Sequence, residues 1–111
     1  MFEFLRGDAQ GMKQHVISSA KKAILFLPHA IQQMSKPDRM ITTDEIRRVV
    51  MSGDIIEQYP EDKRGVSCLV SFVTQNRAIH VVCAPKPEYL AIITAYLPTR
   101  DQWSLDYKFR K

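Results

Sequence analysis

The chain has 111 residues and a formal net charge of +4, and 45% of its residues are hydrophobic. These values are ordinary for one globular domain, and the length excludes two domains of usual size. The modest basic excess permits nucleic acid as a partner without requiring it. No apolar run approaches the ~20 residues that a membrane span needs, and the N-terminal sequence lacks the layout of a signal peptide. We therefore expect a cytoplasmic protein without a membrane partner.

Helix signals come first along the chain. Residues 1–25 are interpreted as an N-terminal extension, in which the apolar spacing of residues 10–22 is compatible with a helix. Pro28 predicts the start of the next helix, because proline fits the first turn of a helix and breaks its interior. Pro37 predicts that this helix ends by Lys36, since the residue before a proline avoids the helical conformation.

A third helix has clearer boundaries. Thr42 and Glu45 have the spacing of a capping box, and Gly53 stands where a C-cap glycine is common. Between these signals the apolar residues recur on one face, at Ile46, Val49 and Val50. We predict a helix over residues 43–52.

Four segments rich in β-branched and aromatic residues follow. They are residues 54–59, 66–74, 77–84 and 89–98. The last two flank a short turn that contains Pro85 and Pro87, which is the pattern of a buried hairpin. The order of the segments predicts an α+β domain, with two or three N-terminal helices followed by an antiparallel sheet of about four strands.

A two-residue turn at residues 75–76 determines the register of the strands that flank it. It places Cys68 opposite Cys83 and Ser71 opposite His80, at the ~4.5–5.5 Å Cα separation of directly opposed residues. A disulfide can span that distance, but two buried thiols are the expected state in a reducing cytoplasm. The same register predicts that the Ser71 hydroxyl orients the imidazole ring of His80.

Several short strings occur in an order and spacing typical of a known family. They are residues 29–30, 52–57, 59–62, 67–69, 80–82 and 92–96, with Pro98 and Trp103 behind them. Over about residues 26–111, the chain resembles a family of small bacterial proteins named as a domain of unknown function. That family is in turn similar to the RelE/ParE-type toxins, whose fold is shared with several ribonucleases.

The resemblance implies a RelE-like α+β domain over residues 26–111. It also implies RNA or the ribosome as a target, and a small zinc-ribbon protein of antitoxin type as a partner. The chain departs from the family pattern at Gln33, where an arginine is usual, and at Asn76 and Ala78 in a hairpin. The first departure matters if the usual arginine binds phosphate.

Metal-free RNA cleavage needs a base, an acid and cations that hold the phosphate. The candidate acid–base pair is His80, in the middle of a strand, and His29, in the first turn of a helix. The alternatives are a packing role for His29 and a satisfied core position for His80. Tyr96, at the end of the last strand, is a candidate proton donor, and otherwise a core tyrosine with its hydroxyl at the rim.

Guanidinium groups match the geometry of phosphate, so several basic residues are candidates for binding it. They are Arg77, Arg39, Arg100 and, more weakly, Lys63. A solvated surface charge is the simpler alternative for each. Trp103 is expected to cap the packing, and the basic tail from Asp106 onward is expected to be a last strand or an extended arm. No metal-ligand spacing or glycine-rich phosphate loop occurs, so we expect no metal and no cofactor.

The sequence supports two functional hypotheses from different classes. The first is a toxin of a toxin–antitoxin pair that acts as a small metal-independent endoribonuclease, either on free RNA or only on the ribosome. The second is a non-catalytic protein- or RNA-binding module of the same fold.

Overall fold

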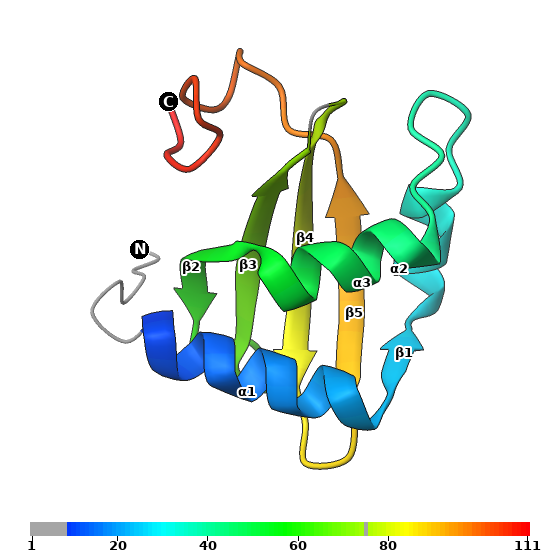
Figure 1. Cartoon of the computed structure of the whole chain (residues 1–111), viewed down its shortest axis with the longest axis vertical. Helices are drawn as coiled ribbons and strands as arrows, with labels where there is room; N and C mark the ends of the chain where they lie inside the picture. The colour runs from blue at the N-terminus through cyan, green and yellow to red at the C-terminus, as the bar shows by residue number, and fades with distance from the viewer. Residues whose placement is uncertain (1–8, 75) are drawn as a thin grey trace.

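A computed structural model of the chain describes residues 9–74 and 76–111, and in these ranges it shows three helices and five strands (Figure 1). In chain order they are α1 (Ala9–Lys22), β1 (Ile24–Phe26), α2 (Pro28–Met34), α3 (Thr43–Ser52), β2 (Asp54–Tyr59), β3 (Ser67–Val73), β4 (Ala78–Pro85) and β5 (Leu90–Tyr96). The α+β class is therefore confirmed. Among the described residues, no helix has the length and apolar character needed to cross a membrane.

The strands form one mixed sheet in the order β1-β5-β4-β3-β2. β1 runs parallel to β5, and the other neighbouring strands are antiparallel. The prediction of a purely antiparallel sheet is wrong, because it omitted β1. A three-residue strand is too short to show alternation, and β1 forms only where the chain brings residues 24–26 beside residues 90–92.

The predicted boundaries of α3 are confirmed. Gly53, which follows the helix, is required for a reason other than the one we predicted. The Glu45 amide donates to Thr42 Oγ1 (3.1 Å), and the Thr42 amide donates to Glu45 Oε1 (3.0 Å), which completes the capping box. Gly53 has φ −78°, so it is not a left-handed cap. A Cβ atom at Gly53 would lie 2.6 Å from the carbonyl oxygen of Val49 and 2.7 Å from that of Ser71. The close approach of α3 to β3 therefore requires glycine.

The helices cover one face of the sheet. α1 and α3 lie across it, and α2 packs beside β5 (Figure 1). Their apolar side chains join those of the sheet in the main core, which includes Met12, Val16, Ala20, Met34, Ile46, Val49, Val70, Ile79, Val81 and Ile92. The helix that we assigned to an N-terminal extension thus shares its core with the rest of the domain.

The predicted register of β3 and β4 is confirmed. Cys68 pairs with Cys83, and Ser71 pairs with His80. The two cysteines are buried and not bonded to each other, with their sulfur atoms 3.9 Å apart. The Cys68 thiol beside it and burial both raise the pKa of Cys83, which keeps the pair as thiols.

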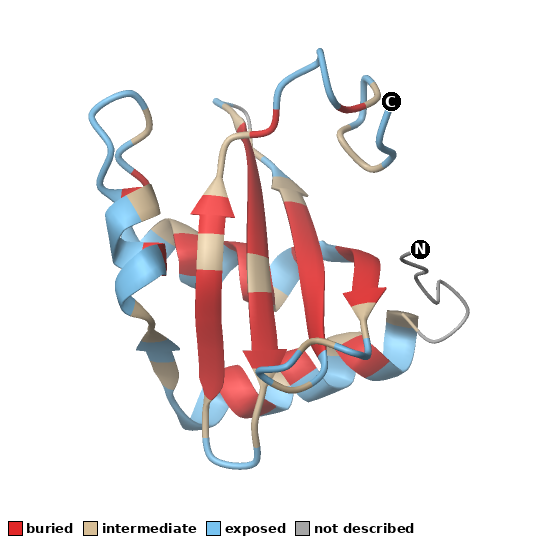
Figure 2. Ribbon diagram, turned by 180° about the vertical axis from the view of Figure 1, so that it is seen from behind, coloured by how far each residue is buried: buried red, intermediate tan, exposed pale blue. Residues whose placement is uncertain are grey.

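The second face of the sheet is covered in part by residues 97–111, which we name the C-terminal segment. Seen from behind, this segment loops past one end of the sheet, and most of the length of the central strands is buried (Figure 2). Trp103 is its anchor and packs with Ile56 and Leu69 in a second apolar cluster. The segment is neither a regular strand nor an extended arm, since a single bridge between Trp103 and Arg110 closes it into a loop.

Candidate functional site

His80 lies on this second face, beneath the C-terminal segment. Its side chain is fully buried. The Trp103 ring meets it edge-on, with centroids 4.5 Å apart and planes at 87°, and the Tyr96 ring lies 5.3 Å away at 66°. The position matches the satisfied core histidine that we considered as the alternative to catalysis.

Both ring nitrogens of His80 have partners. Nε2 lies 2.8 Å from the carbonyl oxygen of Tyr107, and Nδ1 lies 3.2 Å from the hydroxyl of Tyr96. Because a carbonyl only accepts, Nε2 carries the proton and donates it, and Nδ1 accepts from Tyr96. Burial lowers the pKa of His80 to about 4 and raises the pKa of Tyr96 to about 12. Proton transfer from the phenol to the imidazole is therefore strongly unfavourable.

The buried histidine makes stability depend on pH. Its pKa falls from 6.5 to about 4 on folding, so folding favours the neutral ring. Above pH 6.5 the ring is neutral in both states and the free energy of unfolding keeps its full value. As the pH falls from 6.5 toward 4, the unfolded state binds a proton that the folded state does not, and the free energy of unfolding decreases by up to roughly 3 kcal/mol. We expect urea denaturation to show a steeper loss of stability between these pH values for the wild type than for His80→Gln. Equal slopes in the two proteins would contradict the assignment of a neutral buried ring.

A buried carboxylate lies on the neighbouring strand β2. Glu57 is only 2% exposed, and the Arg110 guanidinium donates to both of its oxygens at 2.7 and 3.0 Å. The Tyr59 hydroxyl adds a 2.6 Å hydrogen bond to Glu57. Arg110 also lies over the Trp103 ring, 4.7 Å from its centroid. This cluster ties the end of the C-terminal segment to the sheet, because a buried charge needs its partner in place.

Tyr107 has an unusual backbone that fits this arrangement. Its φ is +61°, a left-handed conformation that costs a bulky residue about 1–3 kcal/mol. The conformation directs its carbonyl oxygen to His80, whose N–H stabilises it. The Arg100 guanidinium lies 5.7 Å from the centroid of the Tyr107 ring, within reach of a cation–π interaction.

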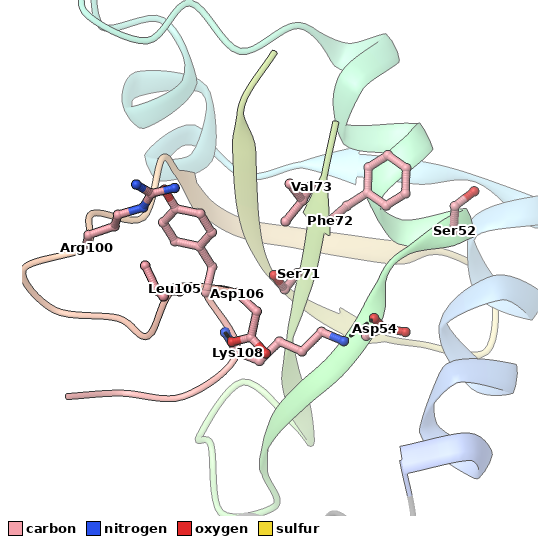
Figure 3. Close-up of a pocket in the computed structure, with 10 residues that line it drawn as sticks. Ser52, Asp54, Ser71, Phe72, Val73, Arg100, Leu105, Asp106 and Lys108 are labelled. Atoms are coloured by element: carbon pink, nitrogen blue, oxygen red, sulfur yellow. Dashed lines mark hydrogen bonds and ion pairs between the residues drawn. The ribbon is translucent and has the colours of Figure 1, made fainter. Parts of the chain in front are cut away.

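A pocket of about 500 Å³ opens between β3 and the C-terminal segment. It is lined by Ser52, Asp54, Ser71, Phe72, Val73, Arg100, Leu105, Asp106, Tyr107 and Lys108 (Figure 3). The hydroxyl of Ser71 is buried without a hydrogen-bond partner, alone among the side-chain polar atoms that the structure describes. The prediction that Ser71 orients His80 is therefore wrong, because Tyr96 and Tyr107 already occupy both ring nitrogens.

Two of the arginines that we predicted to bind phosphate, Arg77 and Arg39, instead form hydrogen bonds within the protein. Arg77 binds the Glu45 carboxylate (2.7 and 3.2 Å) and donates to the backbone carbonyls of Arg39 and Met40. Arg39 donates to the carbonyl of Ala95, at the end of β5. These contacts tie the β3–β4 hairpin and the α2–α3 connection together at the end of the sheet that also holds the C-terminal segment.

The other candidates are divided between the two ends of the sheet. Tyr96 pairs with His80, and Arg100 lines the nearby pocket. Lys63 is exposed in the connection between β2 and β3, at the opposite end. His29 is exposed in the first turn of α2, and no hydrogen bond or ring contact joins it to His80 within the described residues. The acid–base pair of His80 and His29 therefore stays a prediction, and no contact among the described residues supports it.

Sequence reasoning missed Glu57 and the residues that bind it. The available signal was a carboxylate inside an otherwise buried strand pattern, which calls for a buried cationic partner. Its partner Arg110 lies 53 positions away, in a tail without periodicity. Ser71 was singled out for its register, but its unpaired state depends on where the tail lies.

The family model described as a domain of unknown function (DUF4258) matches residues 26–97. This match covers more than half of the chain. The chain belongs to the DUF4258 family. No curated protein and no solved structure matches the chain. The DUF4258 match includes every element from α2 to β5 and ends where the C-terminal segment begins. The part of the pocket that the C-terminal segment lines, including Arg100, Leu105 and Tyr107, therefore lies outside the match.

The described residues include no group of three or more histidine, cysteine or acidic side chains arranged to hold a metal ion. The pocket lining carries two cations (Arg100 and Lys108), two carboxylates (Asp54 and Asp106), the unpaired Ser71 hydroxyl and several aromatic and apolar side chains. Such a set binds a ligand by charge, stacking and one directed hydrogen bond.

Proposed function

We propose that this chain is a non-catalytic module that binds single-stranded RNA through its C-terminal segment. The observation that carries the proposal is the mixture of basic and apolar side chains exposed on that segment. Leu105 is 79% exposed and Phe109 is 51% exposed. The side chains of Lys108 and Arg110 are 42% and 57% exposed, and Arg100 is exposed at the pocket.

Single-stranded nucleic acid is bound by this combination of groups. Cations follow the phosphate backbone, and flat or apolar side chains pack on unpaired bases, with about 1–3 kcal/mol gained for each stacked base. Bases in a duplex are already stacked, so exposed rings gain little from them. The formal net charge of +4 adds favourable long-range attraction.

The binding module is favoured over the endoribonuclease by the state of His80. A ring that is fully buried, with both nitrogens hydrogen-bonded and a pKa of about 4, is suited to fixing the C-terminal segment in place. The relation to RelE-type toxins and the zinc-ribbon antitoxin partner remain proposals that accompany this function.

Fluorescence anisotropy with a labelled single-stranded RNA of about a dozen nucleotides tests the proposal. We expect salt-dependent binding, with a slope of log K against log salt of about −0.7 for each phosphate contacted. Arg100→Gln should weaken binding and reduce the slope. Arg47→Gln is the matched control, since Arg47 is exposed on α3 over the other face of the sheet.

Equal losses in Arg100→Gln and Arg47→Gln would mean that only net charge matters, which contradicts a defined RNA surface. Binding to duplex RNA as strong as to single strands would contradict the stacking argument.

The enzymatic hypothesis now depends most on Tyr96, whose half-buried neutral hydroxyl is a possible proton donor at this end of the sheet. Incubation with RNA, alone and with translating ribosomes, separates the two classes. Cleavage that Tyr96→Phe abolishes would favour the endoribonuclease; we expect no cleavage from either protein.

A further inference from the structure

The floor of the pocket beside β3 carries a polar group that nothing in the domain uses. Ser71 is only 3% exposed, and its hydroxyl has no hydrogen-bond partner. Buried hydroxyls normally have one, because leaving a buried donor or acceptor unpaired destabilises the fold. Its neighbour across the strands, His80, has both nitrogens occupied, so it offers no partner. The partner must therefore come from the pocket, as an ordered water molecule or as a ligand that displaces it.

The charges around the pocket are paired except at one residue. Asp54 forms an ion pair with Lys108 (3.2 Å). Asp106 accepts hydrogen bonds from the Ser104 hydroxyl (2.6 Å) and the Lys108 amide (3.1 Å), and these bonds lower its pKa. Arg100 makes no ion pair or hydrogen bond within the described residues, and its one contact is the Tyr107 ring. The pocket therefore presents one available guanidinium, which suits a single anionic group.

Apart from Ser52, the remaining lining is apolar or aromatic. Val73, Leu105 and Tyr107 contribute walls, and Val73 and Leu105 are 54% and 79% exposed. The ring of Phe72 packs against the main core instead. A volume of about 500 Å³ is within the usual range of small-ligand sites. The lining fits a flat, mostly apolar ring with a polar edge, attached to one anion.

We propose that this pocket binds a nucleoside 5′-monophosphate unit, with the phosphate at Arg100 and the polar edge of the base toward Ser71 (Figure 3). The unit is either a free nucleotide or one residue of an RNA strand. In the second case the inference deepens the proposed RNA-binding function; in the first it holds without it.

The test is an NMR titration of the purified chain with uridine and adenosine 5′-monophosphates. Uridine and inorganic phosphate are added separately as partial probes. We expect the nucleotides to shift the backbone amides of Ser71, Val73, Leu105 and Tyr107, and each partial probe to bind at least tenfold more weakly. Shifts caused equally by phosphate alone would identify a simple anion site and overturn the proposal.

Two variants assign the contacts. Ser71→Ala should weaken nucleotide binding about fivefold, the effect of one lost hydrogen bond, and should not lower the midpoint of thermal unfolding, because the hydroxyl has no partner to lose. Arg100→Gln should weaken nucleotide binding about tenfold and remove the advantage of nucleotide over nucleoside. Arg47→Gln should change neither. Unchanged nucleotide affinity in folded Ser71→Ala and Arg100→Gln would overturn the proposal.

Competition separates the two sources of the nucleotide. If a single-stranded RNA oligonucleotide displaces the monophosphate, the pocket holds a residue of RNA. If the oligonucleotide does not bind while the monophosphate still shifts the pocket amides, the proposed RNA function fails and the nucleotide site stands.

Discussion

Replacement of Trp103 by alanine is expected to lower the free energy of unfolding by about 3–5 kcal/mol. The ring is 2% exposed, packs with Ile56 and Leu69, and meets the edge of His80. Its loss leaves a cavity over the sheet and admits water to the imidazole. Domains have only about 5–15 kcal/mol in total, so this loss is a large fraction of the stability of the protein. Urea denaturation measures the change.

A second observable distinguishes this cavity from a general loss of packing. With water admitted, the pKa of His80 should rise from about 4 toward its ordinary value, as followed by the ring signals in NMR. Trp103→Phe is the matched variant, since it retains an aromatic edge, and it should lose less stability. A loss below about 1 kcal/mol in Trp103→Ala, with the pKa of His80 unchanged, would show that the C-terminal segment does not seal this face.

Replacement of Arg110 by alanine is the second large effect. It leaves the Glu57 carboxylate 2% exposed and without its cation, a change that costs about 3–5 kcal/mol when both partners are fully buried. Because the Arg110 side chain is 57% exposed, water replaces part of the interaction. We therefore expect a loss of about 2 kcal/mol, measured by urea denaturation.

The Glu57→Gln/Arg110→Ala double variant is the control for this explanation. A neutral amide does not need a buried cation, so the double variant should be more stable than Arg110→Ala alone. If Arg110→Ala falls within about 0.5 kcal/mol of the wild type, the ion pair contributes no more than an ordinary surface contact and does not hold the segment on the sheet.

Local signals predicted the parts of the fold that local chemistry determines. The boundaries of α3 follow from side-chain to backbone hydrogen bonds between Thr42 and Glu45, three positions apart. Cys68 faces Cys83 because a turn determines which residues pair beside it. Each further pair along the two antiparallel strands then follows by counting. In both cases the residues that interact are close in the sequence, and regular helix or strand geometry determines how they meet.

The missed features depend on contacts between distant parts of the chain. β1 pairs with a strand that starts more than sixty residues later, and three residues carry no pattern of their own. The C-terminal segment has no periodicity, because its conformation is determined by Trp103, by the ion pair to Glu57 and by the left-handed Tyr107. The pocket exists only after this segment has docked.

The candidate site shows the same limit for single residues. Arg77 has the right chemistry for phosphate, but the folded chain directs its guanidinium to Glu45 and to two backbone carbonyls. Arg100 has the same side chain, but in residues 9–74 and 76–111 no carboxylate or carbonyl binds it. Composition and motif could not separate the two, since the difference is which carboxylates and carbonyls lie nearby.

Photocrosslinking tests most directly whether the C-terminal segment binds RNA. A single-stranded RNA containing 4-thiouridine is irradiated with the full chain, and the crosslinked tryptic peptide is identified by mass spectrometry. Cleavage after Arg100 and Lys108 releases residues 101–108, with Trp103, Leu105 and Tyr107. The account predicts crosslinks in this peptide and in residues 65–77, which carry Ser71 and Val73. Crosslinks confined to residues 14–21 and 40–47, on the helical face, would contradict it.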